Sequence, residues 1–120
     1  MYQHINHATM VTILEEARIP FLADPFGATI TTTGLLIAEV KVSYKGQLRL
    51  VDSPLQVTIR VNRLRAVDFT LGYEVRSVNA DPDAKPAVIA ETQLAAFDID
   101  EQRLVRLSPE HRDYLQQWVR

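Results

Sequence analysis

Apolar side chains near the start of the chain recur every three or four residues, which predicts a helix with one buried face. We place this helix from Asn6 to Leu22. Its apolar stripe consists of Met10, Ile13, Leu14, Ala17 and Phe21. Asn6 suits the N-cap, because its side-chain oxygen can accept from a first-turn amide. Pro20 is expected to kink or end the helix, and the DPFG segment from Asp24 to Gly27 reads as a turn.

Most of the remaining chain alternates between apolar and polar residues, a period that predicts strands. The first strand covers Gly34 to Lys45, and two shorter alternating runs cover Leu55–Val61 and Phe69–Val75. These two runs are near enough in the chain to pair as an antiparallel hairpin. The last strand covers Ala87 to Ile99, where an almost continuous apolar run indicates a central strand lying under a helix.

Turn-forming residues separate these strands and introduce a second helix. VDSP, from Val51 to Pro54, interrupts the chain before the hairpin, and NADPDAKP, from Asn79 to Pro86, has the composition of a loop. Ser108 fits an N-cap with Pro109 at the first helical position, which predicts a short helix ending at Trp118.

One long helix, four or so antiparallel strands and a short helix make an α+β domain, because helix and sheet can bury each other's apolar faces. The chain has 120 residues, enough for a single domain over residues 1–120. The helix has one apolar stripe and the sheet has two faces. An uncovered face or open edge therefore predicts a second subunit, in a homodimer or homotetramer.

Composition narrows the functional classes. The net charge is −2, which argues against a nucleic-acid partner. The chain has no cysteine, and this excludes disulfides, thiolate metal sites and cysteine nucleophiles. No apolar run approaches the roughly 20 residues that span a bilayer, and no basic segment precedes an apolar one near the start. We therefore expect a cytoplasmic protein without a membrane partner.

The opening segment YQHINHATMVTILEEAR resembles the helix-entry motif of hotdog-fold acyl-CoA thioesterases of the 4-hydroxybenzoyl-CoA thioesterase type. The matching positions are Gln3, His4, Ile5, Asn6, Glu15, Glu16, Ala17 and Arg18. The later strands agree in pattern, so the resemblance covers nearly the whole chain. It implies a hotdog fold and hydrolysis of an acyl-CoA thioester, with CoA as part of the substrate and no separate cofactor.

The sequence departs from this family pattern at its start. The family's catalytic aspartate ends a first strand that precedes the motif, and it would fall immediately ahead of Met1. The sequence therefore resembles an N-terminally short version, in which the first strand is missing. We expect a form extended upstream to hydrolyse acyl-CoA, and the 120-residue form to be much weaker and aggregation-prone or dependent on subunit contacts.

The resemblance assigns catalysis to the start of the first helix, where free amides and the helix dipole stabilise the developing negative charge on the thioester oxygen. The residues placed there are His4, Asn6, His7 and Ala8. Asn6 can serve as a cap at the same time. His4 is either a proton carrier or an ordinary loop residue. A metal site formed by His4 and His7 is not assigned, because no acidic or cysteine ligand accompanies them at a recognisable spacing.

Charged residues further along the first helix receive no catalytic role. Glu15 and Glu16 lie roughly 13 Å from the first amides, at 1.5 Å per helical residue. With Arg18 they are expected to form a solvated or subunit-facing flank.

Four residues are candidates for substrate binding, namely Tyr44, Arg63, Arg65 and Phe69. Arg63 and Arg65 belong to a basic run that could meet the phosphates of CoA, but arginine also protects strand edges from aggregation. Phe69 either lines an acyl pocket or packs in the core. Tyr44 is likewise a candidate either for lining an acyl pocket or for packing in the core.

Two other functions stay open at this point. A non-catalytic hotdog module would keep the helix dipole and the pocket without the acid, and would bind acyl thioesters or serve only in dimerisation. A nucleic-acid or protein-interaction domain is the third class, since a fold does not dictate function.

Overall fold

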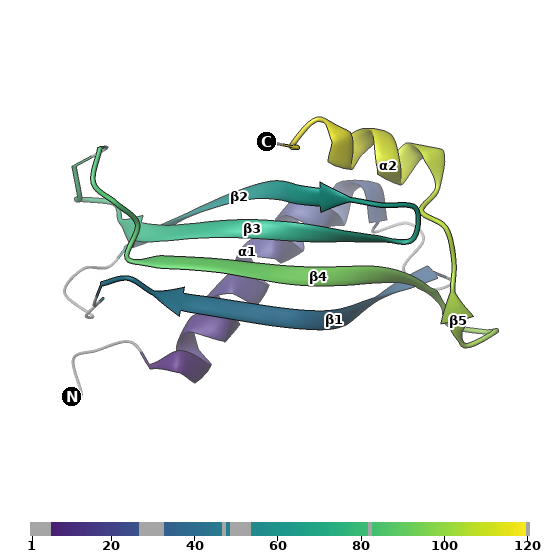
Figure 1. The fold of residues 1–120 in the computed structure, drawn as a ribbon, viewed down its shortest axis with the longest axis horizontal. Coiled ribbons are helices and arrows are strands. Elements are labelled where there is room, and N and C mark those ends of the chain that lie inside the picture. The colour runs from purple at the N-terminus through teal and green to yellow at the C-terminus, as the bar shows by residue number, and fades with distance from the viewer. Residues whose placement is uncertain (1–5, 27–32, 47, 49–53, 82, 120) are drawn as a thin grey trace.

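A computed structural model describes residues 6–26, 33–46, 48, 54–81 and 83–119. The elements along the chain are α1 (His7–Phe26), β1 (Thr33–Tyr44), β2 (Leu55–Leu64), β3 (Asp68–Ser77), β4 (Val88–Asp98), β5 (Arg103–Leu104) and α2 (Pro109–Gln116). The strands form one antiparallel sheet in the order β1-β4-β3-β2, and β5 pairs with β4 (Figure 1). The α+β architecture predicted from the sequence is confirmed.

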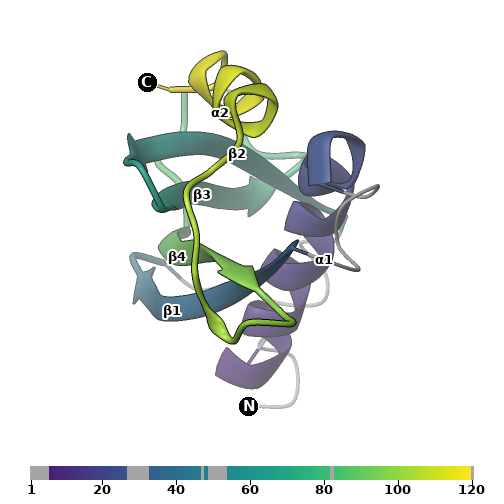
Figure 2. The same cartoon turned by 90° about the vertical axis from the view of Figure 1, so that its right-hand side faces the viewer.

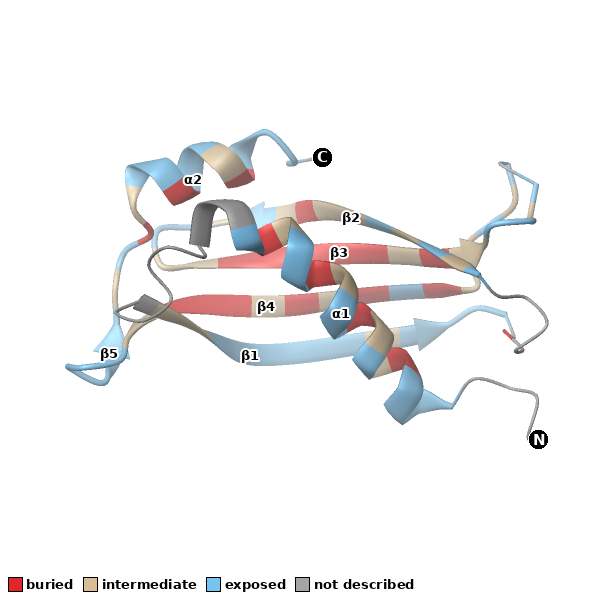
Figure 3. Cartoon of the chain, turned by 180° about the vertical axis from the view of Figure 1, so that it is seen from behind, coloured by how far each residue is buried: buried red, intermediate tan, exposed pale blue. Residues whose placement is uncertain are grey.

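Helix α1 crosses one face of the sheet (Figures 2 and 3). Its buried side chains recur every four residues and are Met10, Leu14, Arg18 and Leu22. Met10 and Leu14 belong to the predicted stripe, whereas the other predicted members are only half-buried. A four-residue repeat exceeds the 3.6 residues of one turn, so the buried stripe drifts around the helix.

Helix α1 continues past its predicted end. It passes through Pro20 and includes residues 24–26, so Pro20 does not end the helix and the prediction of a turn from Asp24 was wrong. Proline removes one hydrogen bond to the carbonyl one turn earlier, that of Glu16. Both Glu16 and Pro20 are exposed, so water can replace the lost donor at little cost. Gly27, the last residue of that predicted turn, lies outside the described residues.

The charged flank predicted for Glu15, Glu16 and Arg18 forms only in part. The two glutamates are exposed, but Arg18 is buried, with 9% of its surface accessible. Its Nη1 donates a hydrogen bond to the Tyr73 hydroxyl on β3, at 3.3 Å. Arg18 follows Leu14 by four residues and so shares its face of the helix, which the sheet covers.

The sheet confirms the predicted hairpin and the central position of the last strand. β2 pairs with β3, and β4 lies between β1 and β3. The four alternating apolar residues of β3 are completely buried beneath α1, and they are Phe69, Leu71, Tyr73 and Val75. Their register partners on β4, from Leu94 to Val88, share the same face of the sheet. This face forms the core.

The C-terminal helix starts as predicted. The Ser108 hydroxyl accepts a hydrogen bond from the His111 amide at 3.1 Å, and Pro109 is the first helical residue. The helix ends at Gln116 instead of Trp118. α2 packs against α1 through Tyr114, whose hydroxyl donates to the Phe21 carbonyl at 2.6 Å. The two-residue strand β5 has no sequence signal, because it is too short to show a period.

Candidate functional site

The start of α1 brings together three of the four residues assigned to catalysis. Asn6 caps the helix, since its Oδ1 accepts from the Thr9 amide at 2.9 Å. His7 and Ala8 are the first two helical residues, and all three are exposed. Within the described residues, neither the His7 nor the Ala8 amide donates a hydrogen bond. His4 lies outside the described part of the chain.

Tyr44 is brought to the same place from a distant part of the sequence. It is the last residue of β1, and its hydroxyl oxygen lies 2.7 Å from Nδ1 of His7. The two rings also meet edge to face, with centroids 5.8 Å apart. Partial burial raises the pKa of the Tyr44 phenol above its ordinary value, which is already well above neutral pH.

An exposed apolar strip runs along β1 and ends at Tyr44 beside the helix start, and we call Ile37, Val40 and Tyr44 the β1 strip. Their exposed fractions are 52%, 43% and 46%. Their register partners on β4 belong to the buried face, so the strip is an uncovered continuation of the core face. Figure 3 shows β1 as exposed while its neighbours beneath α1 are buried.

The other proposed substrate-binding residues lie elsewhere. Phe69 is 0% exposed in the core. Arg65 follows β2, and its Nε pairs with Asp68 Oδ1 at 3.3 Å. Arg63 lies on the face of the sheet opposite α1, because a register shift after Val61 pairs it with Thr70. The structure thus brings only Tyr44 to the helix start.

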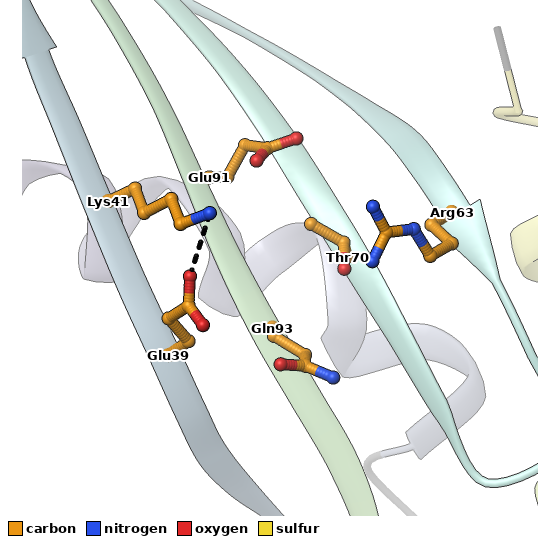
Figure 4. Close-up of a pocket in the computed structure, with 6 residues that line it drawn as sticks. All are labelled: Glu39, Lys41, Arg63, Thr70, Glu91 and Gln93. Atoms are coloured by element: carbon orange, nitrogen blue, oxygen red, sulfur yellow. Dashed lines mark ion pairs between the residues drawn. The ribbon is translucent and has the colours of Figure 1, made fainter.

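A cavity of about 90 Å³ lies on this outer face of the sheet (Figure 4). It is lined by Glu39, Lys41, Arg63, Thr70, Glu91 and Gln93. Lys41 Nζ pairs with Glu39 Oε1 at 3.0 Å, and both side chains are largely exposed. The lining therefore mixes both signs of charge.

Beside the cavity, five side chains form a continuous network of hydrogen bonds and ion pairs. The alternation of the strands had indicated only that this face of the sheet is polar. Glu74 accepts from Arg60 Nη1 at 2.5 Å and from Arg76 Nη2 at 2.9 Å. Asn62 Oδ1 accepts from Arg60 Nε at 2.8 Å, and Asn62 Nδ2 donates to Glu91 Oε2 at 2.7 Å. The hydrogen bond from Arg60, reinforced by Arg76, lowers the pKa of the Glu74 carboxyl against the opposing effect of burial. The network ties β2, β3 and β4 together.

The lowered pKa of Glu74 predicts a pH-dependent contribution to stability. The ionised carboxylate stabilises the fold fully above the unfolded-state pKa, and this stabilisation is lost as the pH falls through the lower folded-state pKa. Glu74→Gln should therefore unfold at a lower urea concentration than the parent at about pH 7. The difference between the two urea midpoints should narrow towards about pH 3. Glu101→Gln is the control, because its ion pair with Arg103 is exposed and should contribute little. A gap that stays constant with pH would contradict the prediction.

In the part of the chain that the structure describes, no group of three or more histidine, aspartate or glutamate side chains is placed to hold a metal ion. None of the described helices is long and apolar enough to cross a bilayer.

The chain is similar to known proteins in sequence and in fold. The family model described as the thioesterase-like superfamily matches residues 1–119. A search of curated protein sequences found no match. Among solved structures, the probable thioesterase YbaW from Escherichia coli is similar, with a TM-score of 0.82 and 24% identity over 100% of this chain and 90% of that chain.

Two further structures share the fold at lower identity. One is a 1,4-dihydroxy-2-naphthoyl-CoA thioesterase from Synechocystis, with a TM-score of 0.76 and 14% identity over 95% of this chain and 84% of its own. The other is a hypothetical protein from Staphylococcus aureus in complex with CoA, with a TM-score of 0.81 and 13% identity over 98% of this chain and 74% of its own. The fold is therefore the hotdog fold that the sequence predicts.

Proposed function

Because the chain belongs to the thioesterase-like superfamily, we propose that it hydrolyses an acyl-CoA thioester to a free acid and CoA. The observation that carries this proposal is the accessible start of α1, where the His7 and Ala8 amides face away from the helix. The similar structures named for a CoA thioesterase and for a CoA complex support the choice of substrate class.

The helix start suits the charge that develops during thioester hydrolysis. When water attacks the carbonyl carbon, the electron pair of the C=O bond moves onto oxygen, and the thiolate leaves as the carbonyl re-forms. The α1 helix of 20 residues places its positive dipole end at this oxygen. Because Asn6 caps the Thr9 amide, the amides of His7 and Ala8 are left to donate to the oxygen.

Activation of the attacking water requires a carboxylate as general base, or as a nucleophile that water later displaces. We propose that a carboxylate outside the described residues supplies this group. Glu15 and Glu16 are exposed and lie too far along α1 to reach the same carbonyl.

A second copy of the chain is the proposed partner at β1. In the described part of the sheet this strand has one neighbour, so its other edge offers unpaired backbone groups. The β1 strip adds apolar surface beside that edge. We propose a homodimer formed there, and sedimentation would separate it from a monomer or a homotetramer.

One substitution at the helix start tests the proposed function. His7→Pro removes the amide hydrogen at the first helical position, where proline is tolerated. His7→Ala removes the same side chain but keeps the amide. We expect His7→Pro to have a kcat about 100-fold below that of His7→Ala, the usual cost of a lost oxyanion donor.

The assay is release of CoA thiol from acyl-CoA, with thermal unfolding of both variants as the check on folding. Equal kcat values in the two variants would refute the role of the His7 amide. Binding of acyl-CoA by calorimetry without any turnover would support the non-catalytic module instead.

A further inference from the structure

The contact between His7 and Tyr44 joins two residues separated by 37 positions in the sequence. The hydrogen bond at 2.7 Å directs Nδ1 of the imidazole, and the edge-to-face contact at 5.8 Å fixes the plane of the ring. Two contacts of different kinds thus hold one side chain at the first residue of α1. An ordinary exposed histidine would rotate freely there.

We propose that Tyr44 is a positioning residue, which donates its hydroxyl hydrogen to Nδ1 of His7 and holds the neutral imidazole as the tautomer with hydrogen on Nε2. This inference rests on the proposed function, to which it adds a side-chain donor. The Nε2–H group then supplements the His7 and Ala8 amides as a hydrogen-bond donor to the thioester oxygen.

The proposed direction of the hydrogen bond rests on the chemistry of the two groups. A neutral imidazole has one donor nitrogen and one acceptor nitrogen, and the partner of one nitrogen decides the state of the other. Among the described residues, His7 is the hydrogen-bond partner of the Tyr44 hydroxyl. The phenol carries its hydrogen at neutral pH, because its ordinary pKa is about 10 and burial raises that pKa. Donation to Nδ1 therefore satisfies both groups and leaves Nε2–H free for a ligand.

The tautomer can be measured without any substrate, from the nitrogen chemical shifts of His7 in an NMR spectrum of the 120-residue chain. The His7 signals are assigned by their loss in His7→Gln. We expect hydrogen on Nε2 in the parent and a mixture of tautomers in Tyr44→Phe. Tyr114→Phe is the matched control, because its hydroxyl donates to the Phe21 carbonyl, and it should leave the His7 tautomer unchanged.

Turnover of acyl-CoA gives the second readout. Tyr44→Phe should lower kcat about tenfold with little change in KM, the scale of one neutral hydrogen bond. His7→Leu should lower kcat about 100-fold. His7→Gln should recover part of this loss, because its amide keeps both an acceptor and a donor. In the His7→Leu background, Tyr44→Phe should have no further effect.

The two readouts separate this inference from the proposed function. Hydrogen on Nδ1 of His7 in the parent, or a Tyr44→Phe effect that persists without His7, would overturn the inference even if acyl-CoA is hydrolysed. The absence of acyl-CoA hydrolysis by the parent would refute the proposed function, while an Nε2–H tautomer lost in Tyr44→Phe would still support the His7–Tyr44 pairing.

Discussion

Phe69→Ala is expected to lower the free energy of unfolding by about 3–5 kcal/mol, the range for truncating a buried aromatic ring. Phe69 is 0% exposed on the middle strand β3, and it faces Leu94 of β4 beneath α1. Removal of the ring leaves a cavity that the paired strands cannot close by moving together. Urea unfolding of parent and variant measures the loss.

Phe69→Leu distinguishes a core residue from a residue that lines an acyl pocket. Leucine keeps much of the volume, so we expect a loss of less than about 1.5 kcal/mol. The preference for acyl chain length should stay that of the parent. A variant with full stability and an altered chain-length preference would instead support the pocket role.

Gly72→Ala is expected to cost about 1–3 kcal/mol of stability, because the new methyl group overpacks a hydrogen-bonded site. A Cβ at this position would lie 2.4 Å from Asn62 Nδ2 and 2.6 Å from its Oδ1. Asn62 cannot move away without losing its hydrogen bonds to Arg60 and Glu91. Among the described glycines, none has a positive φ, so the requirement is for space over β3 and not for an unusual backbone conformation.

A double-mutant cycle tests this explanation by urea unfolding. With Asn62→Ala in place, the obstacle is gone, and Gly72→Ala should then cost much less than it does in the parent. The same cost in both backgrounds would mean that the clash with Asn62 is not the cause.

Much of the fold could be predicted because its periodic patterns are local. The three-and-four spacing around Met10 and Leu14 indicated α1, and the period of two around Phe69 indicated β3. The burial of Arg18 was not predicted, although this residue lies four positions after Leu14. In the sequence alone, a charged side chain at that position indicates exposure to solvent. Its burial follows only from the packing of α1 on the sheet, which brings the Tyr73 hydroxyl within hydrogen-bond distance.

The candidate site was likewise predictable only in part. Asn6 was predicted as the cap from its own side chain and the helix that follows, and its hydrogen bond to the Thr9 amide confirms it. Arg63 could not be placed on a face of the sheet from alternation with Val61, because the register shift between them moves Arg63 to the outer face. A single extra residue in one strand reverses the side to which the next side chain points.

The sequence by itself determined the class of fold, the family and the position of the helix start, because periodicity, capping and the opening motif all act over a few neighbouring residues. Only the tertiary structure decided the meeting of His7 with Tyr44, the exposure of the β1 strip and the burial of Arg18. These depend on the strand order and on the path of α1 across the sheet, which arise from contacts between segments far apart in the chain.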